Sequence, residues 1–163
     1  MRATVFSRHD RDVIDWTRVT PAERWRTTNV RRVETTGVEL GGRYLLGAAG
    51  WIDGQYTRLS TDAVELAGLL SKYVLEYAPH NVAVSGSARL PFAIDLAPRV
   101  GWTSRNDGRS YAVVDVRASR AFARVTLFLD AANLFDESYQ EVVGVSMPGR
   151  WVSGGIRIGG ASK

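Results

Sequence analysis

The 163-residue chain has 45% hydrophobic and 23% charged residues, which predicts one folded domain and excludes a disordered chain. It contains no cysteine, which excludes a disulfide framework and thiolate metal sites. The net charge of +4 comes from 21 basic and 17 acidic residues that are spread along the chain, so we expect no nucleic-acid partner. No apolar run is long enough for a transmembrane helix.

The N-terminal half predicts three strands with polar segments between them. We expect strands over residues 2–9, 25–40 and 43 to about 56. Residues 10–23 are predicted as a polar loop, Gly37 as a bulge, and Gly41-Gly42 as a tight turn. Residues 57–79 are predicted as a long loop, although the spacing over 62–70 also fits a helical turn or two.

The C-terminal half alternates apolar and polar residues more regularly, which is typical of strands with two different environments. Five strands are predicted here, over residues 81–90, 94–103, 111–119, 123–131 and 151–158. Short turns are expected at 91–93, 106–108 and 120–121, and Pro98 predicts a local break in the hydrogen-bond ladder. The chain is therefore predicted to be all-β, an antiparallel meander of about eight strands.

The predicted connections alternate in length. They run about 14, 23, 6 and 16 residues after the first, third, fifth and seventh strands, and only two to four residues after the second, fourth and sixth. Short turns on one rim and long loops on the other are typical of outer-membrane β-barrels, and strands of about ten residues fit a tilted crossing of the hydrocarbon layer.

One face of the last five strands is uncharged, and the other carries charge. The charged face is expected to point into the barrel lumen and holds Arg89, Asp95, Arg99, Asp115, Arg117, Arg124, Asp130 and Arg157. Alternation alone fits a soluble barrel equally well. The small apolar residues and the two sets of aromatic residues favour a lipid-facing surface with interfacial belts, at Tyr56, Trp102 and Tyr111 and at Tyr44, Phe92 and Phe122.

The loop before the last strand carries the most specific motif of the chain. Its residues are Asn133, Leu134, Phe135, Asp136 and Tyr139, followed by Pro148, Gly149 and Arg150. Together with the predicted last strand over residues 151–158, this motif resembles the C-terminal end of TonB-dependent outer-membrane receptors. Further segments in the same order as in that family are Asp12–Trp16, Asn29, Gly37–Leu40, Leu90-Pro91, Tyr111 and Asp115.

The resemblance implies that residues 1–163 form the C-terminal third or so of a barrel of about 22 strands. It implies import of a scarce nutrient, such as a siderophore or cobalamin, across the cell outer membrane. No signal peptide or plug domain is recognised in the sequence. The expected partners are therefore outer-membrane lipid and a missing N-terminal barrel and plug, with TonB reached only through that portion.

No enzymatic chemistry is predicted. His9 and His80 lack acidic residues at metal-ligand spacing, and no hydrolase or phosphate-binding motif is present, so no catalytic residue, metal or cofactor is expected. The motif residues are interpreted as structural anchors of the loop, with Asn and Asp capping its ends and Phe135 and Tyr139 holding it on the rim.

Two alternative functions remain open from the sequence. Eight strands can close alone, which would give an outer-membrane barrel with a structural or adhesive role. The same alternation also fits a soluble, lipocalin-like barrel that carries a ligand.

Overall fold

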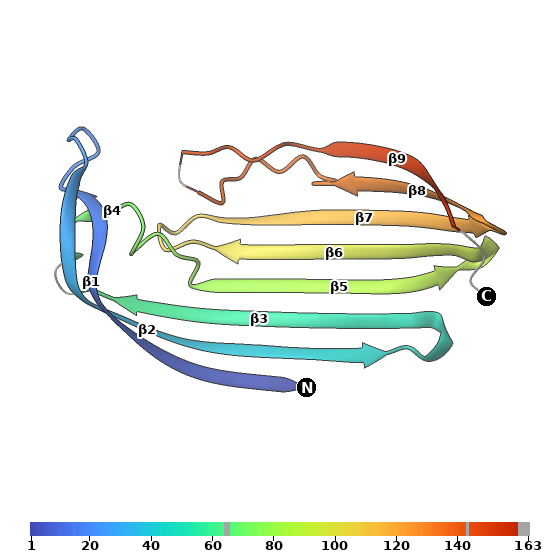
Figure 1. The fold of residues 1–163 in the computed structure, drawn as a ribbon, viewed down its shortest axis with the longest axis horizontal. Helices are drawn as coiled ribbons and strands as arrows, with labels where there is room; N and C mark the ends of the chain where they lie inside the picture. The colour runs from blue at the N-terminus through green and yellow to red at the C-terminus, as the bar shows by residue number, and fades with distance from the viewer. Residues whose placement is uncertain (64–65, 143, 160–163) are drawn as a thin grey trace.

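The computed structural model describes residues 1–63, 66–142 and 144–159, which form one open antiparallel sheet (Figure 1). The sheet order is β4-β1-β2-β3-β5-β6-β7-β8-β9. Its strands are β1 (Arg2–Arg18), β2 (Arg26–Leu45), β3 (Gly50–Asp62), β4 (Leu70–Ser71), β5 (His80–Leu90), β6 (Ile94–Ser104), β7 (Ser110–Phe122), β8 (Val125–Ala132) and β9 (Trp151–Ile158). The predicted all-β, antiparallel fold is confirmed.

Eight of the nine strands are long, and the exception is β4, which has two residues. The long strands pair in sequence order, so that β3 pairs directly with β5. The short β4 pairs instead with the end of β1, where Thr17 lies opposite Ser71. Residues 66–79 therefore form a loop that returns to the first strand. The predicted helical turn over 62–70 includes residues 64–65, which lie outside the described residues.

The boundaries predicted for the first strands are wrong. Gly41 and Gly42 do not form a turn, because they continue the β2 ladder opposite Gln55 and Gly54. The chain reverses further on, at residues 46–49, where Gly47 has a φ of 64°. Likewise β1 continues through the predicted loop to residue 18, and its polar sequence hid this part of the strand.

Gly37 is not a bulge, since it pairs with Phe6 on one side and with Leu59 on the other. A Cβ at this position would lie 2.4 Å from Cζ of Phe6. The glycine therefore makes room for an aromatic ring that lies across the strand.

In the C-terminal half the predicted strands are confirmed, with shifted ends. The break at Pro98 is also confirmed, because the β5–β6 ladder omits the pairs between Ser85–Arg99 and Ala88–Leu96. The predicted turn at 120–121 is wrong: β7 continues to residue 122, and the turn is Ala123, with a φ of 50°, and Arg124.

The alternation of loop lengths is confirmed. The turns at 46–49, 91–93 and 123–124 lie together at one rim. The connections 19–25, 63–79, 105–109 and 133–150 lie at the other, which is on the left in Figure 1. Below we call these the turn rim and the loop rim.

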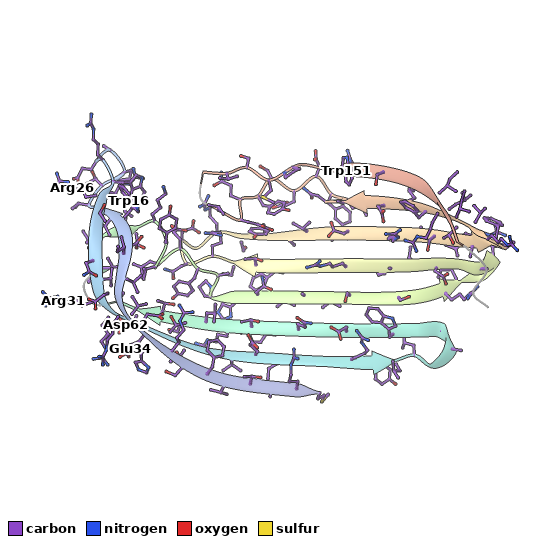
Figure 2. All side chains as sticks on the ribbon, viewed as in Figure 1. Trp16, Arg26, Arg31, Glu34, Asp62 and Trp151 are labelled. Carbon is purple, nitrogen blue, oxygen red and sulfur yellow. The ribbon has the colours of Figure 1, made fainter. Side chains whose placement is uncertain are left out.

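At the loop rim the β1–β2 hairpin bends out of line with the other strands (Figure 1). Asp12 adopts a φ of 55° just before the bend, and Glu34 of β2 lies opposite Asp62 of β3 beside it (Figure 2). The bend brings the hairpin against the loop that follows β3. There Val30, Val33, Ala63 and Leu66 form the buried hydrophobic cluster of the described chain.

Candidate functional site

The charged face follows from the register, because directly opposed residues of neighbouring strands share a face. Asp115 of β7 lies opposite Arg99 of β6, which in turn lies opposite Ser85 of β5. Ion pairs extend along the same face, with N–O distances of 3.9 Å for Arg89–Asp95, 3.6 Å for Arg117–Asp130 and 3.3 Å for Arg43–Asp53.

Seven of the eight residues predicted on the charged face lie in strands, and Arg157 stands there opposite Thr126. The exception is Arg124, which belongs to the two-residue turn between β7 and β8. It was assigned to a strand because the reversal was predicted a few residues too early. Its carbonyl accepts a hydrogen bond from the Gly159 N–H at 2.9 Å.

The opposite face forms an uncharged band. It begins near the loop rim with a row of directly opposed residues: Leu40, Tyr56, Val82, Trp102 and Ala112. It ends near the turn rim at the row Leu90, Ile94, Arg120, Leu127 and Ile156, and Arg120 is the single charged residue in these two rows. Along β5 these rows are eight residues apart, about 27 Å at 3.4 Å per residue. The nine residues from Val82 to Leu90 fall within the range of about 9–11 residues with which a tilted strand crosses the hydrocarbon core of a bilayer.

Aromatic residues border this band, with one correction. Tyr56 and Trp102 lie on the uncharged face as predicted, but Tyr111 shares the charged face with Asp115. Tyr111 instead packs on Tyr139, with ring centroids 4.7 Å apart. Burial raises the pKa of Tyr139, with a further contribution from the nearby Glu141 carboxylate, so the phenol stays protonated.

Asn133 organises the motif loop. It is 4% exposed and has a φ of 48°. Its side-chain amide donates to the Glu137 carbonyl at 2.8 Å and to the Pro148 carbonyl at 3.3 Å, and its side-chain oxygen accepts from the Glu137 N–H at 2.8 Å. The Asn133 N–H donates to Asp115 at 2.9 Å, which links the loop to the charged face.

The second half of the motif closes the same loop. The Asp136 carboxylate accepts a hydrogen bond from the Arg150 N–H at 2.7 Å. A Cβ at Gly149 would lie 2.5 Å from the same carboxylate, so a side chain does not fit there. Leu134 extends the β7 pairing through its N–H to the Val114 carbonyl at 2.8 Å, whereas the Phe135 side chain is 73% exposed.

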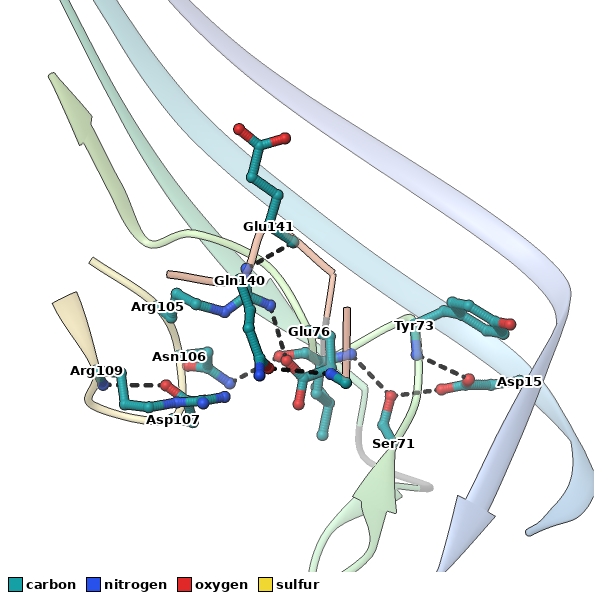
Figure 3. Close-up of polar contacts among 12 residues, drawn as sticks. Asp15, Ser71, Tyr73, Glu76, Arg105, Asn106, Asp107, Arg109, Gln140 and Glu141 are labelled. Atoms are coloured by element: carbon teal, nitrogen blue, oxygen red, sulfur yellow. Dashed lines mark hydrogen bonds and ion pairs between the residues drawn. The ribbon is translucent and has the colours of Figure 1, made fainter. Parts of the chain in front are cut away.

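Two polar centres at the loop rim were missed by the sequence analysis. Asp15 is fully buried and accepts hydrogen bonds from the Ser71 hydroxyl and from the N–H groups of Tyr73 and Val74 (Figure 3). It joins the bent hairpin to the 63–79 loop. Asp15 belongs to the segment Asp12–Trp16 that resembles the receptor family, but nothing in that segment indicates its burial or its partners.

Arg105 is the second centre, 8% exposed and surrounded by three loops. It donates to the Glu76 carboxylate and to the Glu141 carbonyl, both at 2.9 Å (Figure 3). The loops 72–79, 105–109 and 133–150 are thereby tied to one guanidinium group.

Beside this centre the charged face is hollowed. A hollow of about 260 Å³ is lined by Arg99, Asp115 and Asn81 from the strands and by Tyr139 and Glu141 from the motif loop. A second hollow, of about 360 Å³, lies between residues 105–111 and 138–140. Within residues 1–63, 66–142 and 144–159, no group of three or more metal-ligating side chains gathers, and no helix is long and apolar enough to span a membrane.

No protein-family model matches the chain, and no curated protein matches it. Among solved structures, the chain is similar to the pyoverdine outer membrane receptor FpvA from Pseudomonas aeruginosa PAO1 bound to pyoverdine. The TM-score is 0.70 at 14% sequence identity, with 96% of this chain and 26% of that chain covered. The fold therefore resembles the barrel of a TonB-dependent receptor, and the chain spans about a quarter of that receptor's length.

Proposed function

We propose that this chain is the C-terminal part of the barrel wall of a TonB-dependent outer-membrane receptor that imports a scarce nutrient of the siderophore or cobalamin type. The observation that carries the proposal is the uncharged band, which has bilayer height, aromatic residues at its borders, and long loops beyond one border only. The fold of a pyoverdine receptor, shared over 96% of the chain, supports a transporter of this kind.

In this proposal the uncharged face contacts outer-membrane lipid, and the charged face lines the lumen. The ion pairs Arg117–Asp130 and Arg43–Asp53 then lie in water rather than lipid. The free edges of β1 and β9 pair with the preceding part of a wider barrel, which also carries the plug and the segment that contacts TonB. A stand-alone eight-stranded barrel would need β1 to pair with β9. In this structure β1 and β9 are the long strands at the two opposite ends of the sheet order.

Spin labels at neighbouring positions 114 and 115 test the orientation. Val114 belongs to the uncharged face and Asp115 to the charged one. A label at position 114 in reconstituted bilayers is expected to be relaxed by oxygen, which concentrates in lipid, and a label at 115 by a water-soluble nickel chelate. The reverse pattern would refute the lipid-facing assignment and favour a soluble, lipocalin-like barrel.

Transport requires a second experiment. The chain is expressed with an added signal sequence in cells that lack a chosen receptor, alone and together with that receptor's plug and N-terminal barrel strands. Uptake of the receptor's ligand is expected only in the combined strain. Uptake with this chain alone would show that it is a complete transporter by itself.

A further inference from the structure

The hollow between residues 105–111 and 138–140 is lined by donors of hydrogen bonds. Arg105 and Arg109 contribute guanidinium groups, Ser110 and Ser138 contribute hydroxyls, and Gln140 contributes an amide. No carboxylate is among its lining residues in the described chain. The hollow therefore has positive charge and donors on its walls.

Both arginine side chains are held in place by hydrogen bonds, and Arg109 keeps donors free. The Arg109 Nε and Nη2 bind Asp107 at 2.7 and 2.5 Å, which leaves the Nη1 donors of its five N–H groups. Arg105 uses Nη1 and Nη2 for the neighbouring loops and its Nε is buried, so it contributes charge to the hollow rather than a free donor. Such fixed donors need no reorganisation when an anion binds.

The remaining walls suit the same ligand. The Gln140 side-chain oxygen already accepts a hydrogen bond from the Gly144 N–H at 3.0 Å, so its NH₂ group is the part left for a ligand. The lining residue Tyr139 presents a protonated phenol, whose pKa burial raises further, so it adds no negative charge to the hollow.

We propose that this hollow binds an oxyanion, the carboxylate or phosphate group of a soluble ligand that arrives from the loop rim. Of the acidic residues nearby, Glu76 binds Arg105 and Asp107 binds Arg109, while Glu141, whose carboxylate lies near Tyr139, is not among the residues that line the hollow. Binding as such does not need transport or a bilayer. The assignment of the anion as part of an imported nutrient rests on the proposed function.

The test uses the whole chain refolded in a neutral detergent and titrated with inorganic phosphate, and separately with acetate, while backbone amide shifts are recorded by NMR. Saturable shifts are expected at residues 109–110 and 138–140. Shifts spread over all arginine-bearing segments would overturn the proposal, since they indicate unspecific charge attraction. A second series adds anionic phospholipid to the micelles, and the same shifts without phosphate would overturn the assignment to a soluble ligand in favour of a lipid headgroup.

Two variants and a matched control sharpen the test. Arg109→Gln is expected to weaken binding about tenfold or more, the effect of losing a hydrogen bond from a charged donor. Ser138→Glu is expected to abolish it, because it adds a carboxylate to the hollow without touching the 105–109 turn. The control Arg89→Gln removes a similarly exposed arginine, paired with one aspartate at the other rim, and should leave binding unchanged. Equal weakening by Arg89→Gln and Arg109→Gln would refute the site, even if the barrel inserts into membranes as proposed.

Discussion

The strand wall and the loop rim of this molecule are stabilised in different ways. The wall is a ladder of backbone hydrogen bonds, and large side chains on its uncharged face, such as Leu129 and Val152, are more than half exposed. The loop rim holds the fully buried side chains of the described chain, namely Asp15, Val30 and Leu66. A sheet with so little core of its own depends on its surroundings, whereas the rim is folded by its own contacts. Substitutions can therefore separate the two regions.

The largest effect is expected at Asp15. Asp15→Ala leaves the Ser71 hydroxyl and the backbone N–H groups of Trp16, Tyr73 and Val74 without their acceptor in a place that is at least partly buried. Each hydrogen bond to a charged group contributes about 1.5–3 kcal/mol, so we expect the rim to lose about 3–5 kcal/mol. Hydrogen exchange should speed up at residues 71–75 and stay slow in β6 and β7. Equal acceleration in the wall would show that the two regions do not fold separately.

The next effect concerns depth in the membrane. Val116 lies in the middle of the uncharged band, opposite Pro98 and Ala131. Val116→Arg is expected to cost about 2–4 kcal/mol of folding free energy in a bilayer, as for a cation at mid-depth on a lipid face. The measurement is a urea titration of folding into vesicles.

Leu127→Arg serves as the matched control. Leu127 lies opposite Arg120 in the last row of the band, where an arginine is already present. Its substitution should cost only about 0–1 kcal/mol, because the penalty falls near the interface. Equal costs at positions 116 and 127 would contradict the depth assignment.

The same division explains what the sequence predicts well. In the wall, alternate residues of a strand point to opposite faces, so the face of a residue follows from its position in the local sequence. Strands β5 to β9, the opposite faces of Asp115 and Val114, and the break at Pro98 could therefore be predicted. Where the strands extend beyond the uncharged band, both faces are polar and alternation disappears. The course of β1 beyond residue 9 was therefore lost.

The rim is not readable in this way, because its contacts join residues far apart in sequence. Asp15 meets Ser71 across 56 positions, and Arg105 meets Glu141 across 36. Asp15 stands in the segment Asp12–Trp16 that resembles the receptor family, but neither its burial nor the partners of Arg105 follow from the local sequence. The motif loop was the exception, because its ordered side chains, such as Asn133, bind within the loop itself.

A smaller effect is expected in the motif loop. Asn133→Ala removes three side-chain hydrogen bonds and places alanine at a positive φ. We expect the loop to lose about 2 kcal/mol of local stability, which is the scale of one or two buried polar groups left unpaired. Limited proteolysis should cut within residues 137–148 faster than in the parent chain. Gly149→Ala should act in the same direction, since its Cβ displaces Asp136, and an unchanged cleavage rate in both variants would contradict the role of the motif as an anchor.

The smallest effect is a pH dependence at the 105–109 turn. The hydrogen bond from Arg109 holds the pKa of Asp107 below its usual range, despite an opposing contribution from burial. A lowered pKa in the folded state means that the pair stabilises the turn above about pH 4, near the pKa of an unfolded aspartate, and that this stability is lost as the pH falls through the folded pKa. Because the pair is partly exposed, we expect less than about 1 kcal/mol. The Arg109 amide, which donates to the same carboxylate at 3.0 Å, should report the titration by NMR between about pH 2 and pH 5. In Asp107→Asn that transition should vanish, and its persistence would show that another group titrates there.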